Sequence, residues 1–232
     1  MQTIVLIPGY MCDGNVWKNL KPELKKKNYK VIIPKFNRGK TIQEFAQQTL
    51  KLLPEQFSVV GFSMGGFVAL NLAMNNPKRV QKLILVGSNG RAISKDRKSI
   101  LNKSLADFNN RNYIKKFISN NFDKYFIKSN LENKSYINLI RSMTKKHSYS
   151  SFKRQTNAIL NRPNLLNQLR KVSVKTFIIA GYHDQLSPKD LNIELNKKIK
   201  NSKIKFIKKS GHFTMLEEPY LFNKEVINFL DL

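Results

Sequence analysis

The sequence of 232 residues is poor in cysteine, in acidic residues and in long apolar runs. Its single cysteine, Cys12, excludes a disulfide within the chain and is typical of a reducing compartment. No apolar run approaches the ~18 residues that a membrane span requires. The short apolar run Thr3–Ile7 stops at Pro8 and follows no basic region of the kind that opens a signal peptide. We therefore predict a cytoplasmic protein without a membrane span.

The scarcity of acidic residues leaves a large positive charge, because 42 Lys and Arg face only 15 Asp and Glu, a formal net charge of +27. Such a charge is typical of proteins that bind nucleic acid or another acidic partner. The lysines are nevertheless scattered over every expected element, as they would be on a solvated surface or after drift of an AT-rich coding sequence. No RNA-binding motif or aromatic and basic stacking strip is present, so we predict no specific nucleic-acid binding.

Short β-branched runs alternate with segments of helical periodicity. This alternation predicts an α/β fold with a mostly parallel sheet of about six strands flanked by helices. The expected strands are Thr3–Ile7, Tyr29–Pro34, Phe57–Gly61, Gln81–Val86, Lys175–Ala180 and Lys203–Lys208. The expected helices are Val16–Lys26, Ile42–Leu52, Met64–Asn75, Pro188–Ile199 and Pro219–Leu230.

The alternation is interrupted from about Arg91 to Asn167, where short amphipathic helices but no strand are expected. We interpret residues 91–167 as an all-helical lid over a site at the carboxyl ends of the strands, and residues 1–90 and 168–232 as the core. Most aromatic side chains of the lid are expected to pack it onto the core. The same segment holds 17 Lys and Arg against 4 Asp and Glu, so it is the most basic part of the chain.

The most informative motif is Gly61-Phe62-Ser63-Met64-Gly65-Gly66, which follows an expected strand and opens an expected helix. A serine on such a sharp turn adopts a strained backbone conformation, and glycine two residues before and after it removes steric clashes. The turn holds the hydroxyl at the positive end of the helix. This arrangement predicts Ser63 as a nucleophile.

A serine nucleophile needs a base and a carboxylate that orients the base. Of the three histidines, His147 lies in a polar run and is interpreted as solvated surface, and His183 as a loop residue. His212 follows the sixth expected strand directly, where a base could meet Ser63. Asp184 follows the fifth strand, and Ser187 directly before Pro188 is the better-placed helix cap, which leaves Asp184 free to orient the base.

These motifs resemble the α/β-hydrolase superfamily, with Ser63, Asp184 and His212 in the chain order of that superfamily. The run Pro8-Gly9-Tyr10-Met11-Cys12-Asp13-Gly14 followed by Trp17 is similar to small carboxylesterases, including the pimeloyl-carrier-protein methyl ester esterases of biotin synthesis. Many relatives have His-Gly where this chain has Pro8-Gly9. The chain also begins at what would be the third strand of the family, so the usual N-terminal strand pair is expected to be absent.

The resemblance implies an oxyanion hole formed by the backbone N–H groups of Tyr10 and Met64, and it implies no cofactor and no metal. Cys12 lies in the same loop but lacks a base, so we interpret it as a buried packing residue.

We therefore expect a serine esterase that acts through an acyl-enzyme on a small-molecule ester or on a carrier-protein-bound acyl methyl ester, with the basic lid attracting an acidic acyl-carrier protein. Thioester hydrolysis, lactone opening and carbon–carbon bond hydrolysis use the same three residues and stay open. A non-catalytic basic binding protein on the same fold is the remaining alternative.

Overall fold

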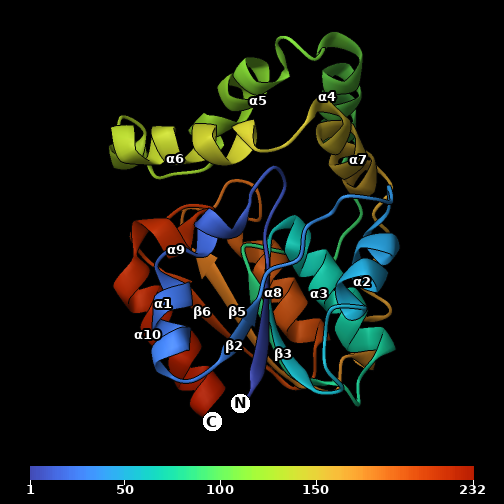
Figure 1. Ribbon diagram of the computed structural model, residues 1–232, viewed down its shortest axis with the longest axis vertical. Helices are drawn as coiled ribbons and strands as arrows, with labels where there is room; N and C mark the ends of the chain where they lie inside the picture. Colours follow the sequence, from blue (N-terminus) through green and yellow to red (C-terminus); the bar gives the residue numbers. More distant parts are fainter.

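The computed structural model describes residues 1–232 and contains a parallel β-sheet with helices on both faces (Figure 1). Its six strands follow the order β2-β1-β3-β4-β5-β6, and all neighbouring strands are parallel. The predicted fold class is confirmed. The strands are β1 (Thr3–Ile7), β2 (Lys30–Ile32), β3 (Phe57–Phe62), β4 (Val80–Val86), β5 (Lys175–Gly181) and β6 (Ser202–Ile207).

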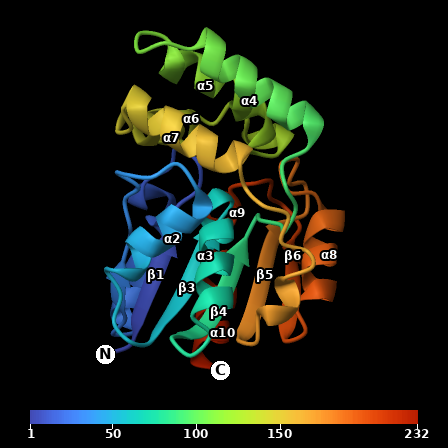
Figure 2. The ribbon, with the colours of Figure 1, turned by 90° about the vertical axis from the view of Figure 1, so that its right-hand side faces the viewer.

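Alternate side chains of the central strands point to opposite faces of the sheet, and each face builds its own core. In β1, Val5 and Ile7 belong to one buried cluster and Ile4 and Leu6 to the other. The first cluster packs under α2 (Ile42–Leu50), α3 (Met64–Asn75) and α8 (Lys189–Lys198) (Figure 2). The second packs under α1 (Leu20–Lys26) and α10 (Pro219–Asp231), with the short α9 (Thr214–Glu217) at its end (Figure 1).

Two elements are shorter than the sequence predicts by three residues or more. The expected helix Val16–Lys26 is divided into a 3₁₀ turn, Gly14–Trp17, and α1. Pro22 explains the division, because proline has no N–H to bond to Lys18 and therefore cannot continue a helix from the turn. The expected strand Tyr29–Pro34 is reduced to β2, which lies at the edge of the sheet and pairs only with β1.

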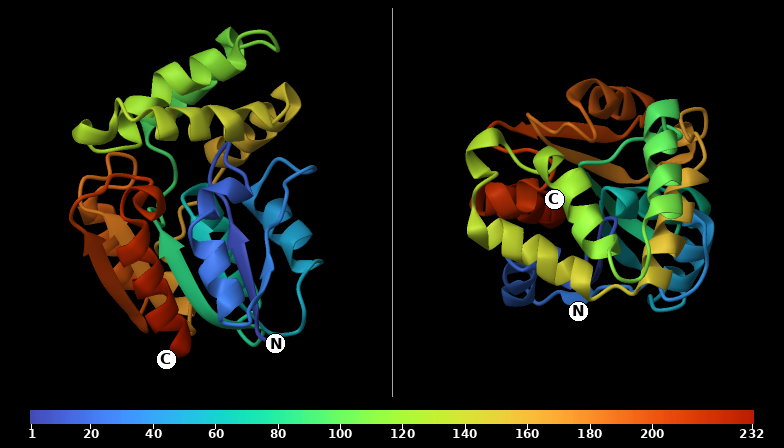
Figure 3. Two further views of the ribbon diagram at one scale, coloured as in Figure 1. Left: turned by 60° about the vertical axis from the view of Figure 1, so that its left-hand side comes forward. Right: turned by 90° about the horizontal axis from the view of Figure 1, so that it is seen from above.

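The helices α4 (Lys95–Asp107), α5 (Tyr113–Asn121), α6 (Lys134–Lys145) and α7 (Tyr149–Leu160) follow one another between β4 and β5, with short 3₁₀ turns at Phe122–Lys124 and Lys128–Asn130. We call residues 91–167 the helical segment. It lies across the carboxyl ends of the strands, at the opposite end of the molecule from both termini (Figures 1 and 3).

The helical segment is held to the core by an aromatic cluster. Phe108, Phe117 and Phe152 are buried together against Met11, and Tyr10 packs on the same cluster. These aromatic side chains therefore pack, as expected. None of the helices combines the length and the apolarity that crossing a membrane would require.

Candidate active site

Ser63 lies on a tight turn between β3 and α3. Its backbone angles are φ 51° and ψ −114°, a region that costs a non-glycine residue about 1–3 kcal/mol. The turn is possible because the backbone approaches closely at two glycines. A Cβ atom on Gly61 would lie 2.4 Å from the carbonyl oxygen of Gly65, and a Cβ atom on Gly65 would lie 2.4 Å from that of Ile7. The sequence therefore folds locally into the strained turn that its glycines predicted.

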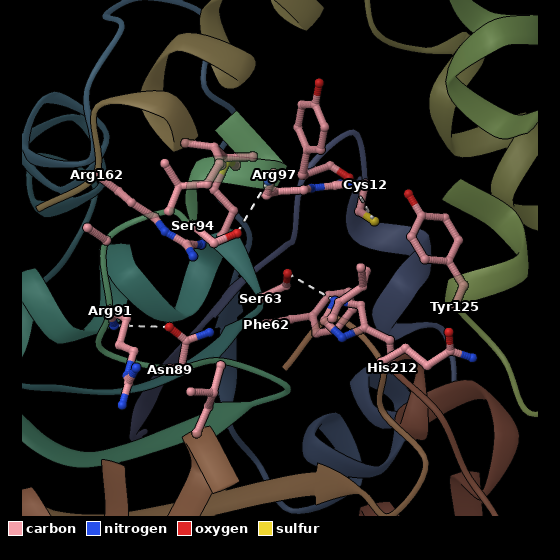
Figure 4. Close-up of a pocket in the computed structure, with 18 of the residues that line it drawn as sticks. Cys12, Phe62, Ser63, Asn89, Arg91, Ser94, Arg97, Tyr125, Arg162 and His212 are labelled. Carbon is pink, nitrogen blue, oxygen red and sulfur yellow. Dashed lines mark hydrogen bonds between the residues drawn. The ribbon is translucent and has the colours of Figure 1, made fainter. Parts of the chain in front are cut away.

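The structure brings Ser63, His212 and Asp184 into one hydrogen-bonded line. His212 Nε2 lies 3.0 Å from Ser63 Oγ, and His212 Nδ1 lies 2.8 Å from Asp184 Oδ2. Both His212 and Asp184 are buried, and the three residues follow the carboxyl ends of β3, β5 and β6. Residues up to 149 positions apart in sequence thus meet at one edge of the sheet (Figure 4).

The second carboxylate oxygen of Asp184 also has a defined role. Asp184 Oδ1 accepts hydrogen bonds from the backbone N–H groups of Leu186 at 2.8 Å and Ser187 at 2.9 Å. The prediction that Ser187 caps the following helix is wrong, since α8 begins at Lys189 without a side-chain cap and Ser187 is itself bound by Asn192. Asp184 therefore closes its own turn and faces His212 at the same time.

The loop between β1 and α1 contains Tyr10, one of the two residues whose backbone N–H groups were expected to form an oxyanion hole. A β-turn closed by the Cys12 N–H and the Gly9 carbonyl at 3.1 Å places Met11 at φ 55°. Gln155 Oε1 on α7 accepts the Met11 N–H at 2.9 Å. The Tyr10 N–H donates to no other group of the protein, and Met64 is the first residue of α3, where an N–H has no acceptor within the helix.

The fold matches that of known proteins. The model of the alpha/beta hydrolase fold family matches residues 40–219. The chain belongs to this family. A pimeloyl-[acyl-carrier protein] methyl ester esterase of Legionella pneumophila (strain Corby) is 28% identical over 225 residues, which cover 94% of this chain and 91% of the relative. The resemblance and the hydrolase class predicted from the sequence are confirmed.

Solved structures agree on the fold of this α/β hydrolase. A thermophilic esterase from Thermogutta terrifontis, solved with malate bound, superposes with a TM-score of 0.90 over 100% of this chain and 90% of its own, at 20% identity. The enol-lactonase from Burkholderia xenovorans LB400 superposes with a TM-score of 0.89 over 100% of this chain and 92% of its own, at 19% identity.

Beside Ser63 the α/β hydrolase has a cavity of about 400 Å³, which is large enough for a small organic ligand. Cys12, Phe62, Tyr125, Leu186 and Phe213 are among the residues that line it. Burial raises the pKa of the Cys12 thiol well above its usual range, with a smaller contribution from the charge of Asp13. A neutral thiol is a poor nucleophile, which agrees with the predicted packing role of this residue.

Several contacts at the site were not predicted from the sequence. His147 is half-buried rather than solvated, and its Nε2 lies 3.1 Å from the carbonyl oxygen of Cys12. Burial lowers the pKa of His147, against the opposing effect of this hydrogen bond. His183, in contrast, is exposed as expected. No local sequence signal marked His147, because its partner lies 135 residues away.

Glu217 is a second unpredicted residue, and it joins the His212 loop to the helical segment. Glu217 Oε2 accepts the Gly211 N–H at 2.6 Å, while Oε1 accepts the Ile127 N–H at 2.9 Å. The His212 N–H donates to the carbonyl oxygen of Tyr125 at 2.9 Å. The only sequence feature that pointed to Glu217 is its position in the Glu-Glu-Pro run after His212.

No group of three or more His, Cys, Asp or Glu side chains lies close enough together to hold a metal ion.

Proposed function

We propose that the protein hydrolyses carboxylic esters through Ser63, His212 and Asp184. The observation that carries this proposal is the continuous line Ser63 Oγ, His212 Nε2, His212 Nδ1 and Asp184 Oδ2, with separations of 3.0 and 2.8 Å. This line has the geometry of a nucleophile, a base and an orienting group, and it is buried at the wall of a cavity.

In the proposed reaction, His212 accepts the proton of Ser63 while the serine oxygen attacks the ester carbonyl carbon. The tetrahedral oxyanion is stabilised by the N–H groups of Tyr10 and Met64, each worth about 3–4 kcal/mol in enzymes where such a donor was removed. His212 then protonates the leaving alcohol, and the carbon–oxygen bond to the alcohol breaks. Water, deprotonated by His212, releases the acid from the acyl-enzyme, and Asp184 holds the imidazole throughout.

The helical segment is proposed as a lid over this site. It contributes Tyr125 and Ile159 to the cavity wall, and its residue Gln155 binds the loop that carries Tyr10. A cover of this kind excludes water from the acyl-enzyme until the alcohol has left. On this proposal, residues 1–90 and 168–232 form the catalytic core and residues 91–167 the lid.

A carrier-protein-bound acyl methyl ester is a specific candidate substrate. Its support is the name of the Legionella relative, together with the charge of +13 that residues 91–167 carry. A basic surface beside the site would accelerate the approach of an acidic acyl-carrier protein. Cleavage of such an ester should then weaken steeply with added salt, whereas cleavage of a small neutral ester should not. An equal response of the two substrates to salt would remove this candidate.

The catalytic proposal is tested by a fluorophosphonate probe, which labels only an activated serine, and by p-nitrophenyl esters. Wild-type protein should be labelled and active, whereas Ser63→Ala should lose both properties. Ser99→Ala, an exposed serine of α4, is the matched control and should lose neither. His212→Ala should also lose activity, with the exposed His183→Ala as its control. Full esterase activity of Ser63→Ala would refute the proposal.

The same experiment separates the rival functions. Absence of labelling in folded wild-type protein would favour a non-catalytic binding protein on this fold. Labelling accompanied by faster turnover of thioesters, lactones or carbon–carbon bond substrates than of esters would favour another reaction of the same three residues.

A further inference from the structure

The cavity beside Ser63 contains positive charge that no acidic side chain neutralises. Arg91, Arg97 and Arg162 line it, and no Asp or Glu does. Arg91 is paired, since its Nε and Nη2 atoms donate to the carboxylate of Glu194 at 2.7 and 2.8 Å. The guanidinium of Arg97 donates only to the neutral Asn121 side chain, at 2.9 Å. Two of the three arginines therefore have no carboxylate partner.

Arg162 is the more unusual of the two. Its Nε atom is buried and has no hydrogen-bond partner, and its guanidinium lies over the ring of Phe67, 4.4 Å from the ring centroid. Burial lowers the pKa of Arg162, and together with a smaller effect of the positive charge of Arg97 it brings that pKa to about 10. Arg162 is still charged at neutral pH. Arg162 as a whole is half-buried, and a half-buried cation without a counter-ion is unfavourable, so this arrangement opposes stability rather than serving it.

The positive charge of Arg97 also acts on the cavity beside Ser63. Burial raises the pKa values of Tyr10 and Tyr125, and the positive charge of Arg97 opposes both increases. Both tyrosines line the cavity around Ser63. The field of Arg97 therefore extends across the cavity, and an anion placed there would interact favourably with Arg97 and Arg162 together.

The position of His212 fixes which part of an ester meets this charge. His212 must protonate the leaving alcohol, so the alcohol lies on the His212 side of Ser63. In Figure 4 the guanidinium of Arg162 lies on the opposite side of Ser63 from His212 and Tyr125. The acyl chain of a bound ester therefore extends toward Arg162.

We propose that Arg162, together with Arg97, binds a carboxylate at the far end of the acyl chain, so that the substrate is a half-ester of a short dicarboxylic acid. This inference rests on the ester hydrolysis proposed above. An arginine fork suits a carboxylate because it donates two parallel hydrogen bonds. Ser63 forms the acyl-enzyme as the alcohol leaves, and water then cleaves the acyl–serine bond. The products are the alcohol, the dicarboxylate and one proton.

The kinetic test compares esters that differ only in this carboxylate. Monoethyl succinate, glutarate and adipate are paired with ethyl butyrate, valerate and hexanoate, and ethanol release is followed. At one chain length the wild-type kcat/KM should favour the half-ester. Arg162→Gln should reduce that ratio roughly ten- to hundredfold, the effect of losing a charged hydrogen bond. Arg170→Gln removes an exposed charge outside the cavity and should leave the ratio unchanged.

A binding test gives a readout that needs no turnover. Succinate, glutarate and adipate are titrated into Ser63→Ala by calorimetry, with butyrate, valerate and hexanoate as neutral-ended controls. A dicarboxylate should bind more tightly than its partner, and adding Arg162→Gln should remove the difference. If circular dichroism shows that Arg162→Gln is misfolded, Arg97→Gln takes its place in both tests with the same expected direction.

The outcomes separate this inference from the proposed function. Binding of dicarboxylates without hydrolysis of any ester would refute the ester hydrolase and retain the carboxylate site. Normal ester hydrolysis through Ser63 without any preference for half-esters, and without dicarboxylate binding, would overturn the inference alone. It would also be overturned if a carrier-bound methyl ester, which has no free carboxylate, were cleaved faster than every half-ester.

Discussion

Replacing Asp184 by asparagine should abolish most of the activity while preserving the fold. Asp184 uses both oxygens, Oδ2 for His212 Nδ1 at 2.8 Å and Oδ1 for the N–H groups of Leu186 and Ser187. Asparagine has only one acceptor oxygen. If that oxygen faces the two N–H groups, the turn is kept and the NH₂ group donates to His212 Nδ1. The imidazole proton then lies on Nε2, which can no longer accept the proton of Ser63.

The opposite orientation of the amide is unfavourable. It would direct the NH₂ group at two backbone N–H donors and leave them without an acceptor, at a cost of about 1–3 kcal/mol each. The inactive tautomer should therefore dominate. In serine proteases the corresponding change reduces kcat about 10⁴-fold, which is equivalent to roughly 5 kcal/mol of lost transition-state stabilisation. We expect a loss of the same order here.

The assay measures kcat/KM on p-nitrophenyl acetate, the rate of fluorophosphonate labelling and the melting temperature. Asp184→Asn should lose activity and labelling together, with little change in melting temperature. Asp184→Ala should in addition melt earlier, because it removes the acceptor for two backbone N–H groups. Asp190→Asn, an exposed carboxylate of α8, is the control. Less than a tenfold loss of activity in folded Asp184→Asn would refute the role of Asp184 in holding the base.

Three further predictions concern the surroundings of the site. Burial lowers the pKa of His147 below its unfolded value of about 6.5, so the stability that His147 contributes is present above that pH and decreases as the pH falls. The melting temperature of His147→Gln should therefore decrease less than that of the wild type between about pH 8 and about pH 5. An unchanged decrease would contradict this prediction. Glu217→Ala leaves the N–H groups of Gly211 and Ile127 without their acceptor, so urea unfolding should show a loss of about 2–6 kcal/mol in the free energy of unfolding, and kcat should decrease. An unchanged kcat would show that this carboxylate does not support the site. Gly65→Ala would place a Cβ atom 2.4 Å from a backbone oxygen, so folded yield and labelling should both collapse, and a normally labelled variant would disprove the close approach.

The sheet could be predicted from the sequence because its signals are local. Each central strand is a short, nearly continuous apolar run that stops at a turn residue, so β1 and β3 begin at the predicted residues Thr3 and Phe57. Ser63 was marked by glycines two positions away. His212 and Asp184 were marked by their positions directly after predicted strands, since the carboxyl ends of parallel strands meet at one edge.

The remaining features depend on contacts between distant segments and leave no local pattern. Arg162 follows α7 in a polar stretch that resembles any helix end, and only the fold places its guanidinium beside Phe67 and the cavity. His147 was misassigned for the same reason. The error at Ser187 has a different cause. A serine before a proline fits the rule for helix caps, but α8 begins one residue later than expected, so Pro188 takes the cap position and Ser187 lies outside it.

The hydrogen bond from the Met11 N–H to Gln155 restricts how this protein can acquire new substrates. A chimera that exchanges residues 95–145 with those of a relative would keep α7, and the loop that carries Tyr10 would retain its support. A chimera that also exchanges α7 would leave a strained turn without the amide that holds it, unless the donor sequence supplies an equivalent side chain. Chimeras of this protein should therefore fold more often when the exchanged segment ends at the turn before Tyr149 than when it ends after α7, at Leu160.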